Sequence, residues 1–320
     1  MTRDKALKLI IQIPCYNEEK ALPATLSALP RSVPGVDTVE WLVINDGSTD
    51  RTVEVAKEHG VDHVVALPRN QGLAKAFMAG LESSLKAGAD IIVNTDADNQ
   101  YSADCIPELI NPILEGKAEM VIGARPIEQI AHFSFTKKLL QRLGSWTVRL
   151  ASNTDIPDAP SGFRAISKEA ARKLNVFNGY TYTLETIIQA GQKNIAITWV
   201  PIRTNEYVRQ SRLVKSLASY IRRSVLTILR IFVVYNPFRF FMSIGALLFI
   251  LGALIGIRFL WYFLNGQGGG HVQSLILASI LIGIGFQTIM VAFIADLLSV
   301  NRRLLEELQY KSRDRGKHKD

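Results

Sequence analysis

Short apolar runs alternate with polar turns and longer mixed segments through the first two thirds of the chain. Predominantly apolar runs that are bounded by Gly, Pro, Asn or Asp predict buried strands at Leu9–Ile13, Trp41–Ile44, Val64–Leu67, Ile91–Val93 and Met120–Gly123. Helices are predicted between them, at Leu73–Lys86 and Asp104–Leu114. Strands that alternate with helices predict an α/β domain built on an open parallel sheet.

Polar residues follow three of these strands at the points where the strands end. They are Pro14-Cys15-Tyr16-Asn17-Glu18 after the first strand, Asn45-Asp46-Gly47-Ser48 after the second and Asp96-Ala97-Asp98-Asn99-Gln100 after the fourth. In a parallel sheet such loops meet at one edge, where ligands bind. Side chains alternate with a period of two in a strand, so Asp96 and Asp98 are expected on one side, offering the oxygen ligands that Mg2+ or Mn2+ prefers. The alternative is a loop in which Asp and Asn cap the next helix.

Two long apolar runs follow in the last third of the chain. Residues 240–257 and 272–295 carry no charged side chain, and each approaches the ~20 apolar residues that cross a bilayer core about 30 Å thick. The chain is 48% hydrophobic and has a mean hydropathy of +0.13, which is apolar for a soluble protein of 320 residues. We therefore predict a two-helix transmembrane hairpin, with a pair of buried core helices as the alternative.

The charge distribution predicts the orientation of this hairpin. The formal net charge is +8, and the connector between the two runs, at Asn265–His271, contains no Lys or Arg. Basic residues crowd the other ends, at Arg222, Arg223, Arg230 and Arg239 before the first run and Arg302, Arg303, Lys311, Arg313, Arg315, Lys317 and Lys319 after the second. The positive-inside rule then predicts an integral protein of the cytoplasmic (inner) membrane with both termini in the cytosol. No cleaved signal peptide is expected.

Two further segments have the character of membrane-surface helices. Apolar residues recur at helical spacing among basic ones in 213–236, and a rougher pattern of the same kind covers 130–149. Ordinary amphipathic helices packed on the α/β domain are the alternative. The predicted boundaries are 1–212 for the α/β domain, 213–236 for the interface helix, 237–300 for two membrane helices and 301–320 for a basic cytosolic tail. Cys15 and Cys105 have no CxxC spacing, so neither a disulfide framework nor a zinc site is expected.

Several motifs together resemble those of a known enzyme family. They are Pro14-Cys15-Tyr16-Asn17-Glu18, Asn45-Asp46-Gly47-Ser48-Thr49-Asp50-Arg51-Thr52, Arg69-Asn70-Gln71-Gly72, Asp96-Ala97-Asp98-Asn99-Gln100 and Ser161-Gly162-Phe163-Arg164. In this order they are similar to the motifs of family 2 glycosyltransferases with a GT-A fold. Within that family they most resemble the polyisoprenyl-phosphate glycosyltransferases, over about residues 7–215.

The resemblance implies a GT-A, Rossmann-like α/β catalytic domain with amphipathic interface helices and a C-terminal transmembrane hairpin. The implied donor is a nucleotide diphosphate sugar, either a UDP- or a GDP-sugar, and the implied acceptor is a polyprenyl phosphate. The implied reaction inverts the anomeric carbon, uses Mg2+ or Mn2+, and yields a polyprenyl-phosphate-linked sugar for glycan assembly. Membrane lipids are further expected partners, a homo-oligomer such as a tetramer is implied, and nucleic acid is not expected as a partner.

The resemblance also implies roles for individual residues. The metal ligands would be Asp98 and Gln100, and the nucleotide would contact Pro14, Tyr16, Glu18, Asp46, Asp96 and Ala97. The acceptor phosphate would be held by Arg125, Ser161, Arg164, Arg209 and Arg212, and the catalytic set would be Asp96, Asp98, Arg125 and Arg164. The residues alone leave alternatives: turn formation for Asp46, a solvated strand end for Arg125, and general attraction to anionic lipid for Arg209 and Arg212.

Two other functions are weighed against this one. A processive polysaccharide synthase would need a Gln-x-x-Arg-Trp motif and enough spans to form a channel, both of which this sequence lacks. A non-enzymatic membrane scaffold would have no use for metal ligands at Asp98 and Gln100. Some relatives carry an acidic residue before the Phe-Arg pair, where this chain has Gly162, so a general base is in doubt and Asp158 is a weak substitute. The sugar, the nucleotide base and the prenyl chain length cannot be read from the sequence.

Overall fold

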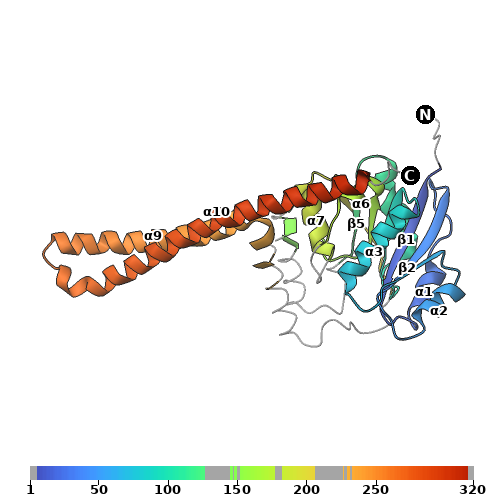
Figure 1. Ribbon diagram of the computed structural model, residues 1–320, viewed down its shortest axis with the longest axis horizontal. Helices are drawn as coiled ribbons and strands as arrows, with labels where there is room; N and C mark the ends of the chain where they lie inside the picture. Colours follow the sequence, from blue (N-terminus) through green and yellow to red (C-terminus); the bar gives the residue numbers. More distant parts are fainter. Residues whose placement is uncertain are drawn as a thin grey trace. The chain divides into compact units, whose positions relative to one another are not determined.

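The computed structural model describes residues 6–126, 145–146, 148–149, 152–176, 182–205, 226, 229–230 and 233–315. The chain divides into two compact units, Met1–Ser224 and Val225–Asp320 (Figure 1). The first is an α/β unit and the second is a helical hairpin. Most residues of two predicted segments lie outside the described part of the chain, namely the interface helix at 213–236 and the second amphipathic segment at 130–149. The predicted phosphate contacts Arg209 and Arg212, and also Lys215, lie outside it as well.

The α/β unit is built on a seven-stranded sheet with the order β3-β2-β1-β4-β6-β5-β7. The strands are β1 (Lys8–Cys15), β2 (Thr38–Asn45), β3 (His63–Ala66), β4 (Ile91–Asn94), β5 (Met120–Ala124), β6 (Arg164–Ser167) and β7 (Ile197–Pro201). Parallel pairing joins β1 to β2 and β4, β2 to β3, and β5 to β7, whereas β6 runs antiparallel to both β4 and β5. The predicted α/β fold is confirmed, but the expectation of an all-parallel sheet is wrong because β6 is inserted in the opposite direction.

Helices cover both faces of this sheet. They are α1 (Leu22–Ala28), α2 (Thr52–Glu58), α3 (Leu73–Lys86), α4 (Ile106–Leu114), α6 (Lys168–Lys173) and α7 (Tyr182–Gln192), with a short 3-10 helix η1 (Ala103–Cys105) before α4. One hydrophobic core joins α1, α2 and α4 to the face of β1 that carries Ile11 and Ile13. The opposite face receives α3, where Gly80 packs so closely on Gln12 that a Cβ there would lie 2.6 Å from the Gln12 Oε1.

The early elements agree with the sequence pattern. All five predicted strands are present as β1 to β5, and α3 has the predicted bounds, because local apolar runs and turn residues specify them. The elements β6, α6, α7 and β7 were not predicted. The strand β6 is only four residues long and begins with a charged residue, Arg164, so its composition gives no strand signal.

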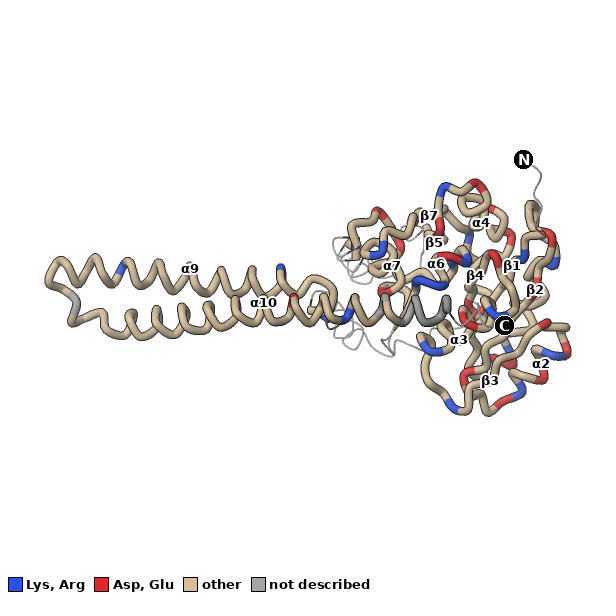
Figure 2. Tube along the Cα trace, turned by 45° about the horizontal axis from the view of Figure 1, so that its top comes forward, with Lys and Arg blue, Asp and Glu red and all other residues tan. Residues whose placement is uncertain are grey.

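The second unit contains α9 (Pro237–Leu264), a 3-10 turn η3 (Gly268–His271) and α10 (Val272–Arg315). Pro237–Leu264 and Gly269–Arg302 are long and apolar enough to cross a membrane, and only 11% and 17% of their most apolar windows are buried. Figure 2 shows few charged positions along α9 and the adjacent stretch of α10. An exposed apolar surface of this size does not suit the core-helix alternative, and it suits a hairpin surrounded by lipid.

Small residues allow α9 and α10 to pack closely. A Cβ at Gly245 would lie 2.9 Å from the Gly285 carbonyl oxygen, and one at Gly252 would lie 3.0 Å from the Ala278 carbonyl oxygen. On α10, Ala278, Gly285 and Ala292 are spaced by seven residues, so they fall on one face. Close backbone approach at small residues is a common source of stability between helices in membranes, where burial of apolar surface gives little driving force.

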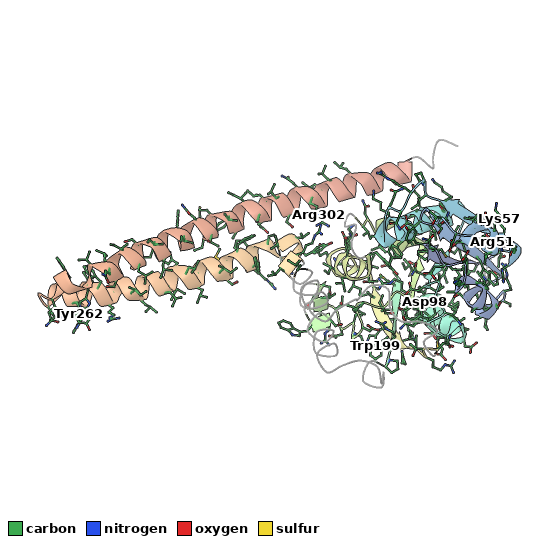
Figure 3. All side chains as sticks on the ribbon, turned by 90° about the horizontal axis from the view of Figure 1, so that it is seen from below. Arg51, Lys57, Asp98, Trp199, Tyr262 and Arg302 are labelled. Carbon is green, nitrogen blue, oxygen red and sulfur yellow. The ribbon has the colours of Figure 1, made fainter. Side chains whose placement is uncertain are left out.

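The helix α10 continues past the apolar run to Arg315, through a region to which the sequence analysis gave no secondary structure. Beyond the apolar run of α10, Arg302 lies over the ring of Tyr235. The Arg302 guanidinium carbon is 4.9 Å from the ring centroid, and its Nη2 is 3.4 Å from the Tyr235 hydroxyl oxygen. Figure 3 places Tyr262 at the connector end of the hairpin and Arg302 far along α10 from it. At the connector end the rings of Tyr262 and His271 lie in contact, tilted by 32°, with their centroids 4.2 Å apart.

Candidate active site

The acidic loop begins just beyond the end of β4. Pairing of β4 with β1 and β6 ends at Asn94, opposite Gln12 and Arg164, and Asp96 and Asp98 lie in the turn that follows. The premise that a strand's period of two would align the two carboxylates is therefore wrong, because the strand has lost its pairing partners before it reaches them. Their arrangement is set instead by the turn, in which the Gln100 N–H donates to Asp98 Oδ1 at 3.1 Å.

Asp96 and Asp98 nevertheless interact electrostatically. Burial and the negative charge of Asp98 raise the pKa of Asp96 to about 6, while the charges of Arg125 and Arg164 and a hydrogen bond from the Tyr101 hydroxyl oppose this rise. Two neighbouring carboxylates are stabilised in their ionised form by a divalent cation, so the donor set of Asp96, Asp98 and the nearby Gln100 fits Mg2+ or Mn2+. Among the described residues no group of three or more His, Cys, Asp or Glu is placed to hold a metal.

A buried hydrogen-bond network fixes the backbone of Gly162 beside Asp96. The Gly162 N–H donates to the Tyr101 hydroxyl at 3.0 Å, and its carbonyl accepts from Asn94 Nδ2 at 2.9 Å. Asn94 Nδ2 also lies 3.0 Å from the Tyr182 hydroxyl, and its Oδ1 accepts from Gln12 Nε2 at 2.9 Å. Gly162 is therefore held from both sides, by Asn94 of β4 and by Tyr101 in the loop after β4, and Gln12 of β1 fixes Asn94 in turn.

No side chain fits at position 162 without moving Asp96. A Cβ on Gly162 would lie 2.9 and 3.0 Å from the two carboxylate oxygens of Asp96 and 3.0 Å from the Tyr182 hydroxyl. Contacts this short are rare for real Cβ atoms. The acidic residue that some relatives carry at this place is therefore incompatible with the present arrangement of Asp96 and Tyr182.

Arg164, predicted to clamp the acceptor phosphate, lies in the interior of the α/β unit. Its side chain is fully buried, and its guanidinium donates to the carbonyl oxygens of Ser161 and Thr183, the latter at 3.2 Å, and to Thr186 Oγ1 at 2.6 Å. The guanidinium carbon is 5.2 Å from the centroid of the Tyr182 ring. In this position its positive charge acts on Asp96 across the interior. Its direct contact with an acceptor stays a prediction.

Arg125, at the end of β5, is held by Asp158. Arg125 donates from Nε to Asp158 Oδ2 at 2.7 Å, from Nη2 to Oδ1 at 3.0 Å, and from its backbone N–H to Oδ2 at 3.1 Å. The Arg125 side chain is 10% exposed and that of Asp158 is 1% exposed. A solvated arginine at a strand end, the sequence-based alternative, does not describe this residue. The Asp158 carboxylate accepts these three hydrogen bonds from Arg125, so Asp158 is a poor general base.

The loops after β2 and β3 interlock on the other side of the sheet edge. Asp46 is buried, and its two carboxylate oxygens accept the N–H groups of Gln71 at 2.7 Å and Gly72 at 2.9 Å. Gly47 has a φ of 69° and approaches the backbone of Arg69 so closely that a Cβ would lie 2.4 Å from its carbonyl carbon. Asp46 thus performs the turn-forming role that its residue type allowed, and this role joins two of the predicted motifs.

The remaining predicted nucleotide contacts occupy the same edge. Pro14 lies near the end of β1, opposite Ile44 of β2, and Tyr16 beyond it is 43% exposed. The Glu18 N–H donates to Thr52 Oγ1 at 2.9 Å, which ties the first loop to the start of α2. The Ala97 carbonyl accepts from Thr25 Oγ1 of α1 at 2.7 Å. The acidic loop, shown by the Asp98 label in Figure 3, is thereby attached to α1.

The sequence analysis gave no role to three polar residues of this site: Asn94, Tyr101 and Asn205, whose Nδ2 donates to the Asn99 carbonyl at 2.9 Å. A buried Asn at the end of the apolar run Ile91–Val93 is a usable signal, because an unpaired amide in a core strand is costly. Tyr101 and Asn205 give no comparable signal, since their partners are distant in the sequence.

A sequence model of a known family matches this chain over residues 10–174, which is 165 of its 320 residues, and the description of that family is glycosyl transferase family 2. The chain belongs to glycosyl transferase family 2. The matched region includes most of β1, all of β2 to β6, the acidic loop, Arg125 and Gly162. The protein is therefore a glycosyltransferase, and its resemblance to this family is confirmed.

Relatives of this glycosyltransferase act on lipid phosphates, according to their names. It is 28% identical over 206 residues to an undecaprenyl-phosphate mannosyltransferase from Micrococcus luteus, covering 61% of this chain and 83% of that protein. It is 31% identical over 222 residues to a UDP-N-acetylglucosamine–dolichyl-phosphate N-acetylglucosaminyltransferase from Methanococcus voltae, covering 63% and 86%. A dolichol-phosphate mannosyltransferase from Pyrococcus furiosus is 28% identical over 275 residues, covering 81% of this chain and 73% of that protein.

Solved structures with a similar fold include glucosyl-3-phosphoglycerate synthase from Mycobacterium tuberculosis in complex with Mn2+, UDP and glucosyl-3-phosphoglycerate. This structure superposes with a TM-score of 0.54 at 20% identity, over 70% of this chain and 79% of that chain. At this identity the likeness concerns the fold. It confirms the predicted GT-A-like α/β sheet.

Proposed function

We propose that this glycosyltransferase moves a sugar from a nucleotide diphosphate sugar to a polyprenyl phosphate, with inversion at the anomeric carbon. The observation that carries the acceptor class is the exposed apolar hairpin of α9 and α10, joined in one chain to a family 2 domain. A hairpin of this kind keeps the enzyme at the membrane, where a lipid acceptor is found. The names of the relatives support the same class, and they differ in the sugar.

A divalent metal fits the site. Mg2+ or Mn2+, held by Asp98 and Gln100 with Asp96 nearby, would neutralise charge on the departing diphosphate. Glucosyl-3-phosphoglycerate synthase, which has a similar fold, has been solved with either Mn2+ or Mg2+ and UDP. The metal preference and the nucleotide of the present enzyme are parts of the proposal.

The protein's own residues would bind and align the substrates. Arg125 is fixed by Asp158 in an orientation that leaves it at the end of β5, beside the acidic loop, where it can pair with a phosphate. Asp46, Tyr16 and the loops they belong to would bind the nucleotide. Arg209 and Arg212 remain predicted contacts of the acceptor phosphate. Positioning and fixed charges then supply most of the rate acceleration.

The proposed transfer needs no side-chain base. A phosphate monoester carries a charge of about −1.5 to −2 at pH 7, so an ionised oxygen of the acceptor can attack the anomeric carbon directly. The new bond joins that oxygen to the carbon while the bond to the diphosphate oxygen breaks, and the electron pair leaves with the nucleoside diphosphate. Gly162 leaves no room for a carboxylate beside Asp96, and Asp158 is paired with Arg125, which agrees with a reaction without a base.

The decisive experiment supplies the substrates directly. Membranes that contain the wild-type protein are incubated with a polyprenyl phosphate and, in turn, with radiolabelled UDP- and GDP-sugars, and the lipid fraction is extracted and counted. We expect label in lipid for one donor, dependent on the added polyprenyl phosphate, and none with an Asp98→Asn control. Label in a polymer that resists lipid extraction, or none in lipid with any donor, would refute the acceptor class.

We propose, further, that both termini lie in the cytosol and that the protein forms a homo-oligomer in the cytoplasmic membrane. A cysteine introduced at Gly269, in the connector, should react with a membrane-impermeant maleimide in intact cells, after Cys15 and Cys105 have been replaced by serine. A cysteine at Lys317 should not react. The opposite labelling pattern would reverse the topology.

A further inference from the structure

The turn that carries the proposed metal ligands contains a residue in an unfavourable backbone conformation. Asn99 lies between Asp98 and Gln100 and has a φ of 55°. Residues with a Cβ are disfavoured in this left-handed region, although Asn tolerates it better than most. The reversal at Asn99 is what brings the Gln100 N–H within 3.1 Å of Asp98 Oδ1. The relative position of Asp98 and Gln100 therefore depends on what holds Asn99 in place.

That support comes from a residue 106 positions later in the chain. Asn205 Nδ2 donates to the Asn99 carbonyl at 2.9 Å and also lies 3.4 Å from Asn99 Oδ1. The backbone N–H of Asn205 donates to the Gln100 carbonyl at 2.9 Å. Asn205 thus binds both residues that follow Asp98, through its side chain and its backbone respectively.

The segment around Asn205 is attached to the same loop at further points. Tyr101 and Thr204 form an isolated antiparallel bridge, and the Ser102 N–H donates to the Arg203 carbonyl at 3.1 Å. The Arg203 N–H donates in turn to Cys105 Sγ at 3.3 Å. Backbone pairing therefore fixes the register of 203–205 against 99–102, and the Asn205 side chain adds a bond aimed at the strained residue.

We propose that Asn205 is a positioning residue for the divalent metal. By holding Asn99 in its left-handed conformation, it keeps Asp98 and Gln100 in the arrangement that binds the cation. The inference rests on the proposed function only in placing a divalent metal at Asp98 and Gln100, and it does not depend on the identity of the sugar or the acceptor.

The experiment measures metal binding rather than turnover. Full-length protein in detergent is titrated with Mn2+, alone and with UDP or GDP, and free Mn2+ is followed by its electron paramagnetic resonance signal. Asn205→Ala should bind Mn2+ about three- to tenfold more weakly than wild type, the range expected for losing a neutral hydrogen bond or two. The matched control is Asn111→Ala, which removes a side-chain bond to Glu115 on the exposed face of α4 and should leave binding unchanged.

A double-mutant cycle separates positioning from a general loss of structure. Asn99→Val introduces a β-branched residue that resists positive φ, so it should weaken Mn2+ binding as Asn205→Ala does. If the two residues act through the same backbone conformation, the double variant should bind little worse than either single variant. Effects that simply multiply would overturn the proposal, as would wild-type Mn2+ binding in Asn205→Ala. Asn205→Ser provides the same comparison if the alanine variant fails to fold.

The outcomes for this proposal and for the proposed function can be told apart. A wild-type protein that binds Mn2+ but transfers no sugar to polyprenyl phosphate would refute the function and leave the role of Asn205 open to the same cycle. A wild-type protein that transfers sugar but binds no Mn2+ or Mg2+ would refute the role of Asn205 and leave the acceptor class intact.

Discussion

The pair formed by Arg125 and Asp158 allows a sharp test of what Asp158 does. Asp158 lies three residues before Ser161, and the sequence alone made it a weak candidate for a general base. In the structure its carboxylate accepts three hydrogen bonds from Arg125, and only 1% of its side chain is exposed. We predict that Asp158 orients Arg125 and takes no part in proton transfer.

The magnitude follows from the burial of the pair. Removing one partner of a buried ion pair costs about 3 to 5 kcal/mol, because the other charge is left without compensation. For a unit of this size each 1 kcal/mol lowers Tm by roughly 2 to 4 °C, so Asp158→Ala should lower Tm by roughly 6 to 20 °C. Asp158→Asn keeps the shape and one acceptor, and its loss of about 1.5 to 3 kcal/mol corresponds to roughly 3 to 12 °C.

The assay follows tryptophan fluorescence of the full-length protein in detergent during heating at a fixed scan rate, together with transfer kinetics. Arg125→Ala and Asp158→Ala should each be strongly destabilising, and the double variant should be less destabilised than the sum, with a coupling of at least ~2 kcal/mol. The matched control is the exposed pair Glu169 and Arg172 on α6, 3.4 Å apart, whose coupling should stay below about 1 kcal/mol.

A general base predicts a different pattern. Asp158→Asn would then lower kcat about 10²- to 10⁴-fold at saturating substrates without changing Tm. On our interpretation Asp158→Asn lowers Tm and raises the acceptor KM through the misplaced Arg125, while kcat falls by less than tenfold. A variant with unchanged Tm and a collapsed kcat would refute the reasoning.

Three further predictions concern metal dependence, the packing of α9 on α10, and Asp50 in the loop after β2. Asp98→Ala should abolish transfer while leaving Tm within about 2 °C, because a partly exposed loop ligand contributes little to the core; EDTA should reproduce this loss and added Mn2+ should reverse it, and full activity in metal-free buffer would contradict it. Gly252→Leu should lower the thermal stability of the hairpin, because even a Cβ there would lie 2.8 to 3.0 Å from atoms of α10. Gly283→Leu is the control and should have little effect, because a Cβ there meets nothing within 4 Å. Melting in detergent, followed by helical circular dichroism, compares the two, and equal effects would contradict the close packing of α9 on α10. Burial raises the pKa of Asp50, but hydrogen bonds from the Thr52 hydroxyl and from the N–H groups of Glu19 and Thr52 outweigh this and lower the pKa below its usual value. The stability that Asp50 contributes is present above the unfolded pKa of about 4 and is lost as pH falls through the folded pKa. The Tm advantage of wild type over Asp50→Asn should therefore shrink from pH 6 to pH 3, and an advantage independent of pH would contradict this prediction.

Local patterns in the sequence determined much of this protein. The strands β1 to β5 and the helix α3 follow from apolar runs and turn residues that are contiguous in the chain, and the hairpin follows from two uncharged runs. The gathering of Asp46, Asp96 and Asp98 at one sheet edge follows from the βα order, because parallel strands bring their carboxyl ends together. Such features depend on neighbours within a few residues, so the sequence contains them directly.

The tertiary structure alone decided how the site is assembled. The reversed strand β6, the buried guanidinium of Arg164, the pairing of Arg125 with Asp158, and the support of Asn99 by Asn205 all join residues that the linear pattern leaves unrelated. The separations are 19 and 22 residues for Arg164 with Thr183 and Thr186, 33 for Arg125 with Asp158, and 106 for Asn99 with Asn205. A hydrogen bond or ion pair between distant residues forms only once the chain has folded. The type of a residue does not identify the distant residue that it will contact, so these pairs could not be predicted from the sequence pattern.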